Sequence, residues 1–140
     1  MIDNHYLERP VFVCGHRKCG TTMLINLLDG APDALVYPDD SGFFYMYYPR
    51  YASDNFTDLE KKERLANRIA EKNLGEVIER LPDDKDLIKN LNGQKSEFVK
   101  RIRDWEVKNF RTKDILQHFI ESFRKSFFLS LSPKVWIEKT

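Results

Sequence analysis

The sequence predicts an α/β fold in which helices flank a parallel sheet. Three observations predict it: a short apolar run at residues 10–14 ends at a glycine-rich segment, apolar residues at helical spacing follow, and a second apolar run begins at Ala34. Parallel strands need a crossover connection between them, and this connection is usually a helix. The order strand, loop, helix and strand is therefore the opening of a parallel sheet.

The elements of this opening are predicted from residue type and spacing. The run at 10–14 is short and rich in β-branched residues, which predicts a buried strand with Cys14 as a small buried residue at its end. A helix is predicted over 22–29, and Gly30 is a suitable residue to stop it. A second strand is predicted over 34–37, between two prolines. The apolar positions of the helix are Met23, Leu24, Leu27 and Leu28.

The middle of the chain predicts a helical insertion at about residues 55–131. Thr57 and Glu60 match the capping box that starts many helices, and this helix is expected to stop near Pro82. The charged segment 83–86 then predicts a solvated connection. The apolar face of the helix is formed by Leu65, Ile69, Leu74, Val77, Ile78 and Leu81.

Two further helices and a last strand complete the predicted elements. Ser96 and Thr112 are the expected N-caps of the two helices, because hydroxyl side chains satisfy amides of the first turn. The last strand is predicted over 135–137. The apolar positions of the two helices are Phe98, Val99, Ile102 and Trp105, then Ile115, Leu116, Phe119, Ile120, Phe123 and Phe127.

Length and composition are those of one soluble globular domain. The 140 residues are 41% hydrophobic and 32% charged, and the net charge of +1 gives no general attraction to nucleic acid. No apolar run reaches the length of about 18 residues that a transmembrane helix needs. The N-terminus lacks the pattern of a signal peptide, so we expect a cytoplasmic protein if the chain is complete there. The chain stops directly after a strand, which suggests an incomplete domain from the N-terminal part of a longer protein.

The loop after the first strand predicts an anion-binding site. Gly15 and Gly20 have the spacing of the two glycines in a nucleotide-binding P-loop, where backbone amides and a helix N-terminus hold phosphate. That motif requires a lysine directly after the second glycine, but Thr21 and Thr22 stand there and Lys18 lies inside the loop. A sulfuryl group carries one negative charge fewer than a phosphoryl group and can be transferred without a metal. One lysine near the bridging oxygen would then stabilise the charge on the departing phosphate.

Residues 12–24 resemble the 5′-phosphosulfate-binding segment of sulfotransferases that use 3′-phosphoadenosine 5′-phosphosulfate (PAPS). The resemblance implies a P-loop NTPase-like sulfotransferase fold, with the phosphosulfate loop at 15–22. It implies transfer of a sulfuryl group from PAPS to a hydroxyl or amine of a small-molecule, glycan or peptide acceptor, with Lys18 as a catalytic residue and no metal. The implied cofactor-binding residues are Arg17, Lys18, Cys19, Gly20, Thr21, Thr22 and Met23.

Two further segments carry the same resemblance. Residues 27–33 are similar to the helix end of the family, and in heparan and tyrosylprotein sulfotransferases a catalytic glutamate follows shortly afterwards. Asp39 is the best match for this general base, and Asp40 is the second. Residues 136–140 are similar to the family segment Trp-x-Glu-Lys-Thr-Pro, which makes Lys139 the third catalytic candidate. The Arg and Ser with which the family binds the 3′-phosphate have no match in the chain.

Other interpretations remain open at this point. The glycine spacing also fits a degenerate P-loop kinase or NTPase, and an incomplete domain also fits a non-catalytic fragment. Asp39 and Asp40 are equally suited to a turn after a proline, and Glu138 with Lys139 to an exposed pair near a chain end. The aromatic run at 43–51 suits either an acceptor pocket or packing on the core.

Overall fold

The computed structural model places two compact units, each of which is described by itself. One unit contains the described residues up to Phe43 together with those from Ser130 onwards, and the other lies between them in the sequence. The described residues are 4–16, 18–41, 43, 56–71, 85–106 and 111–139.

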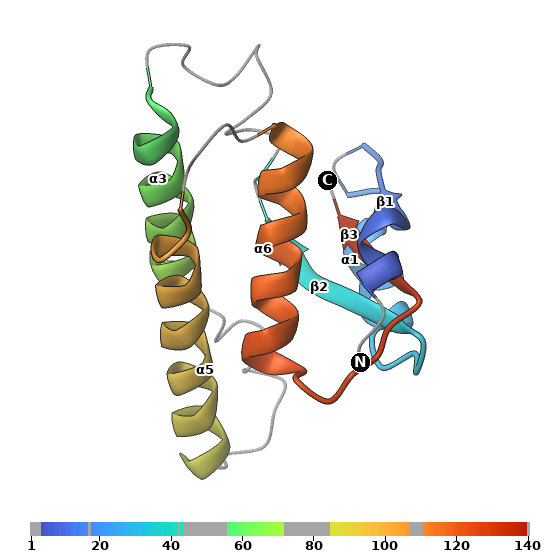
Figure 1. Ribbon diagram of the computed structural model, residues 1–140. Helices are drawn as coiled ribbons and strands as arrows, with labels where there is room; N and C mark the ends of the chain where they lie inside the picture. The colour runs from blue at the N-terminus through green and yellow to red at the C-terminus, as the bar shows by residue number, and fades with distance from the viewer. Residues whose placement is uncertain are drawn as a thin grey trace. The chain divides into compact units, whose positions relative to one another are not determined.

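The first unit is built on a three-stranded parallel sheet with the strand order β1-β3-β2 (Figure 1). The last strand in the sequence, β3, therefore lies between the other two. This arrangement confirms the predicted α/β class with a parallel sheet. The elements are the 3₁₀ helix η1 (Asn4–Glu8), β1 (Pro10–Val13), α1 (Thr21–Leu28), β2 (Ala34–Asp40) and β3 (Val135–Lys139).

The core of this unit takes one buried side chain from each strand and one from α1. Val13, Ile25, Val36 and Ile137 form the cluster, and α1 packs against β2 and β3. Side chains alternate between the two faces of a strand, so Lys139 shares the face of Ile137 on which α1 lies.

The opposite face of the sheet carries Trp136. Its ring packs edge-on against Phe12, with 5.5 Å between the ring centroids. Its Nε1 donates a hydrogen bond of 3.3 Å to the carbonyl of Leu7 in η1. The 3₁₀ helix therefore attaches the start of the chain to the central strand.

The prediction that β1 is a buried strand was wrong. Pro10, Val11 and Phe12 are exposed, only Val13 is buried, and Cys14 is exposed as well. The reason is position, because β1 is an edge strand of the described sheet and hydrogen-bonds to β3 alone. An apolar run does not distinguish a central strand from an edge strand.

The second predicted strand extends further than expected. β2 continues through Pro38 to Asp40, with an irregularity in its register between Val36 and Asp40. Proline has no amide to donate and is therefore tolerated in a strand that lies at an edge or a bulge. The pairing with β3 resumes at Asp40, which lies opposite Lys139.

The second unit consists of three helices in its described part: α3 (Asp58–Glu71), α5 (Lys85–Arg103) and α6 (Thr112–Phe127). α5 packs against both α3 and α6 (Figure 1). The predicted capping box is confirmed, since the Thr57 amide donates to Glu60 Oε2 at 2.7 Å and the Glu60 amide donates to Thr57 Oγ1 at 3.3 Å. The part of the predicted helix beyond Glu71, including Leu74 to Leu81, lies outside the described residues.

Two predicted helix starts were wrong. α5 begins at Lys85, so Ser96 lies inside the helix and two residues of the predicted connection are helical. Packing outweighs the low helix propensity of Asn92 and Gly93 in the middle of this long helix. The N-cap of α6 is Arg111, one residue before Thr112, and its amide donates to Asp114 at 3.3 Å.

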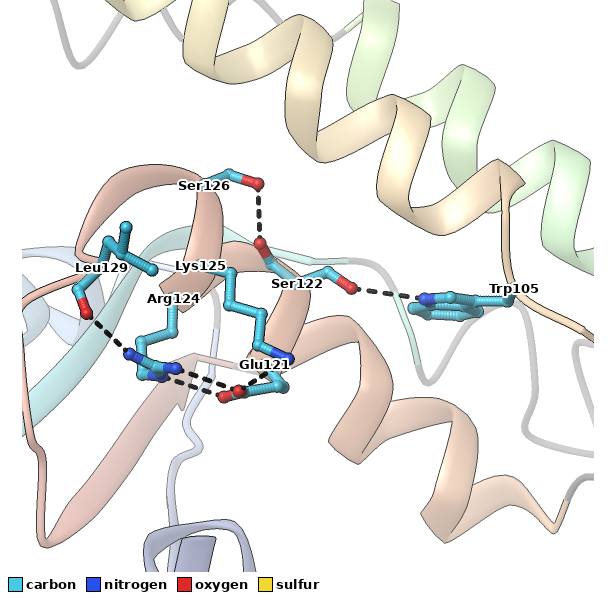
Figure 2. Close-up of polar contacts among 7 residues, drawn as sticks. All are labelled: Trp105, Glu121, Ser122, Arg124, Lys125, Ser126 and Leu129. Atoms are coloured by element: carbon cyan, nitrogen blue, oxygen red, sulfur yellow. Dashed lines mark hydrogen bonds and ion pairs between the residues drawn. The ribbon is translucent and has the colours of Figure 1, made fainter. Parts of the chain in front are cut away.

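The apolar faces of these helices meet in an aromatic core. Phe98 of α5 lies 5.3 Å from Phe119 and 5.7 Å from Phe123 of α6, measured between ring centroids. The described positions that the helical spacing selected are largely buried, as predicted. Trp105, Leu116 and Phe127 are only partly buried. Trp105 lies beyond the end of α5 and donates through Nε1 to Ser122 at 3.3 Å (Figure 2).

A buried ion pair lies on the polar side of α6. The Arg124 side chain is only 3% exposed, and its Nε and Nη2 donate to the two carboxylate oxygens of Glu121 at 2.9 and 3.0 Å. Nη1 donates to the carbonyl of Leu129 at 3.2 Å, and Lys125 also contacts Glu121 (Figure 2). The guanidinium therefore links the turn after α6 to the helix.

No helix in the part of the chain that the structure describes is both long and apolar enough to cross a membrane.

Candidate anion-binding site

The loop between β1 and α1 has the backbone conformation of a tight turn. The Cys19 amide donates to the carbonyl of His16 at 3.1 Å. Lys18 has φ = 64° and Gly20 has φ = 91°, both in the left-handed region. A residue other than glycine is uncommon there, and such residues cluster at functional sites. The loop therefore holds Lys18 in a conformation that its side chain does not favour.

Gly15 is required by the close approach of the loop to its own start. A Cβ added at Gly15 would lie 2.4 Å from Cys19 Sγ and 3.1 Å from Thr21 Cγ2. The first distance is shorter than any van der Waals contact. Glycine therefore suits the two positions of the motif for different reasons. At Gly15 there is little space for a side chain, and at Gly20 the backbone has a positive φ.

The loop leads directly into the first turn of α1. The Leu24 amide donates to the carbonyl of Gly20 at 3.0 Å, and Gly20 caps the helix without a side-chain hydrogen bond. A helix leaves the amides of its first turn without partners inside the helix, and its dipole makes this end attractive to anions. Lys18, Thr22 and Met23 are exposed, so the helix start is accessible.

Lys139, predicted from a segment 117 residues away from Thr22, lies at this loop. Its Nζ donates a hydrogen bond of 3.1 Å to Thr22 Oγ1 in the first turn of α1. The sheet explains the proximity, because Lys139 is the register partner of Val13, the last residue of β1. The carboxyl ends of β1 and β3 thus bring two of the predicted segments together, at the edge where open parallel sheets bind ligands.

The end of β2 reaches the same edge. Asp40 is half-buried and is the register partner of Lys139. Asp39 belongs to the same strand, but its side chain lies outside the described residues, as does Arg17. The strand register places Asp40 opposite Lys139, and register partners in a sheet share a face.

Glu138 is not part of an exposed pair, which corrects one of the interpretations left open above. It is fully buried and accepts a hydrogen bond from Ser41 Oγ. Ser41 Oγ in turn accepts a hydrogen bond of 3.1 Å from the Phe43 amide. Sequence reasoning missed Ser41, for which the one available signal was its place directly after two candidate carboxylates.

The resemblance implied a site that works without a metal. Among the residues that the structure describes, no group of three or more His, Cys, Asp or Glu side chains is arranged to hold a metal ion. Comparison with protein-family models, with curated proteins and with solved structures finds no match to this chain.

Proposed function

We propose that this chain carries the donor site of a PAPS-dependent sulfotransferase. The observation that carries the proposal is the hydrogen bond from Lys139 to Thr22 in the first turn of α1, directly after the loop that contains Lys18. A P-loop kinase places its lysine after the second glycine, where this chain has Thr21. Here the candidate lysines come from other positions, within the loop and at the end of β3.

The loop would hold the 5′-phosphosulfate of PAPS. Its amides and the first turn of α1 would bind the non-bridging oxygens, with hydroxyls from Thr21 and Thr22. Lys18 would lie near the bridging oxygen. As the S–O bond to the phosphate breaks, negative charge develops on that oxygen, and a cation fixed beside it lowers the barrier.

The acceptor also needs a general base. As the acceptor oxygen or nitrogen attacks the sulfur, its proton passes to a carboxylate, and adenosine 3′,5′-bisphosphate leaves. The family resemblance favours Asp39 for this role, whereas the register favours Asp40, the partner of Lys139. We therefore propose Asp40 as the base. Lys139 would orient the sulfuryl group between this carboxylate and the loop.

Calorimetric titration with adenosine 3′,5′-bisphosphate tests the donor site. We expect the full chain to bind it without Mg²⁺ and Lys18→Ala to lose most of the affinity. Lys113→Ala is the matched control, since Lys113 is an exposed lysine at the start of α6 in the other unit, and it should bind like the parent chain. Binding of ATP that depends on Mg²⁺, with no response to the bisphosphate, would instead identify a nucleotide kinase or NTPase. No binding of either ligand would indicate a non-catalytic fragment.

Transfer of labelled sulfuryl from PAPS tests the chemistry. Full activity of Lys18→Ala would refute its assignment. Asp40→Asn should abolish transfer while leaving bisphosphate affinity unchanged, because the carboxylate acts on the acceptor and not on the donor.

A further inference from the structure

The ends of β2 and β3 each pair a candidate functional residue with a buried polar one. On β2, Asp40 is followed by Ser41, which is 2% exposed. On β3, Lys139 is preceded by Glu138, which is 0% exposed. The two candidate residues are register partners, and the two buried residues are hydrogen-bonded to each other.

The hydrogen bonds run in one direction through Ser41. The Phe43 amide donates to Ser41 Oγ at 3.1 Å, and the same hydroxyl donates to Glu138 Oε1. The Ser41 hydroxyl is thus both a donor and an acceptor. These two hydrogen bonds connect Ser41 and the Phe43 amide, which follow β2, to the Glu138 side chain of the central strand.

The sheet leaves a specific need for such a link. Backbone pairing between β2 and β3 is regular from Ala34 to Val36 and then irregular until Asp40. The ladder therefore gives little restraint on residues 37–39, and it pairs again only at Asp40, where the strand ends. A buried carboxylate is also costly compared with an apolar side chain of similar volume, so stability does not explain Glu138 at this position.

We propose that Ser41 and Glu138 are positioning residues that set the separation between Asp40 and Lys139. Their hydrogen bond adds a second link between the two strands, directly after the register pair of Asp40 and Lys139. They touch neither donor nor acceptor, and they act through the residues next to them. The roles of Asp40 and Lys139 rest on the proposed function, whereas the link between the strands does not.

Nuclear magnetic resonance of the full chain tests the link directly. In Ser41→Ala and Glu138→Ala, cross-strand contacts between Asp40 and Lys139 should be lost. Those between Val36 and Ile137 should remain, because this register pair precedes the irregularity. Glu138→Gln is the matched control, since its amide oxygen accepts the same hydrogen bond, and it should keep both sets of contacts.

Activity provides the second measurement. Ser41→Ala should lower kcat by roughly 10- to 100-fold with the KM for PAPS unchanged, because misplacing a reacting group costs rate without costing donor affinity. Glu138→Gln should restore most of the rate relative to Glu138→Ala. Should Glu138→Ala fail to fold, Ser41→Ala decides, since it removes one oxygen atom only.

The outcomes separate this inference from the proposed function. If folded Ser41→Ala keeps the contacts between Asp40 and Lys139, the positioning role is overturned. It is also overturned if the parent chain transfers sulfuryl and Ser41→Ala does so at the same kcat. A parent chain without transfer activity, in which Ser41→Ala still loses these contacts, would refute the proposed function and support the link.

Discussion

Gly15→Ala should weaken anion binding through a steric conflict inside the loop. The added Cβ would lie 2.4 Å from Cys19 Sγ and 3.1 Å from Thr21 Cγ2. Cys19 has to rotate or the loop has to move outward, and binding has to reverse any outward movement. Overpacking of a core typically costs about 1–3 kcal/mol, which is an upper limit here because Cys19 is exposed. Expressed fully in binding, that range corresponds to a dissociation constant roughly 5- to 150-fold higher.

The assay is calorimetric titration with adenosine 3′,5′-bisphosphate, combined with a second substitution at Cys19. In Gly15→Ala with Cys19→Ala, the offending sulfur is absent and the nearest remaining atom of that residue is Cβ, at 3.9 Å. Most of the lost affinity should return, while the Thr21 contact at 3.1 Å keeps the recovery incomplete. Cys19→Ala alone is the reference for the double variant, because it measures what the Cys19 side chain itself contributes to binding.

Two results would refute this reasoning. One is parent-like affinity in Gly15→Ala, which would mean that the loop accepts a side chain at this position. The other is a loss that Cys19→Ala does not relieve, which would mean that the conflict lies elsewhere. Thermal unfolding of each variant separates a local effect from general destabilisation.

Two more predictions follow from backbone conformation and charge. Gly20→Ala and Gly30→Ala should each lose about 1–2 kcal/mol in denaturant unfolding, because both glycines have positive φ (91° and 86°). Only Gly20→Ala should also lose bisphosphate affinity, and equal losses in both variants would contradict the loop assignment. Hydrogen bonds from Thr57, its backbone amide first, hold the pKa of Glu60 below the usual value of 4.5. The folded pKa lies below the unfolded one, so this contribution to stability is present above about pH 4.5 and is lost as the pH falls through the folded pKa. Glu60→Gln should flatten this acid dependence in circular dichroism of the helices, and an unchanged profile would contradict it.

Local signals in the sequence predicted much of the first unit. The α1 helix and the parallel sheet follow from residue types whose conformational preferences act over a few positions. The exposure of Val11 does not follow from them, because burial depends on which strand lies alongside. The start of α5 was missed because Ser96 is a favourable N-cap residue, whereas tertiary packing keeps it inside a longer helix.

The site shows the same division between local and long-range information. The loop could be located from its glycines and Lys18 alone. Preferring Asp40 to Asp39 required the strand register, and the burial of Glu138 required the hydroxyl of Ser41, 97 positions away. Pairings over such distances leave no pattern in a single sequence.

The contact between Lys139 and Thr22 has a consequence for how charge reaches a ligand. Since the ammonium donates to Thr22 Oγ1, the hydroxyl directs its own hydrogen away from the lysine. Donors in such a chain polarise one another, so the threonine becomes a stronger donor than an isolated hydroxyl. A neutral side chain at the helix start can thereby relay part of the positive potential of Lys139 to an anion, while the ammonium itself keeps its water.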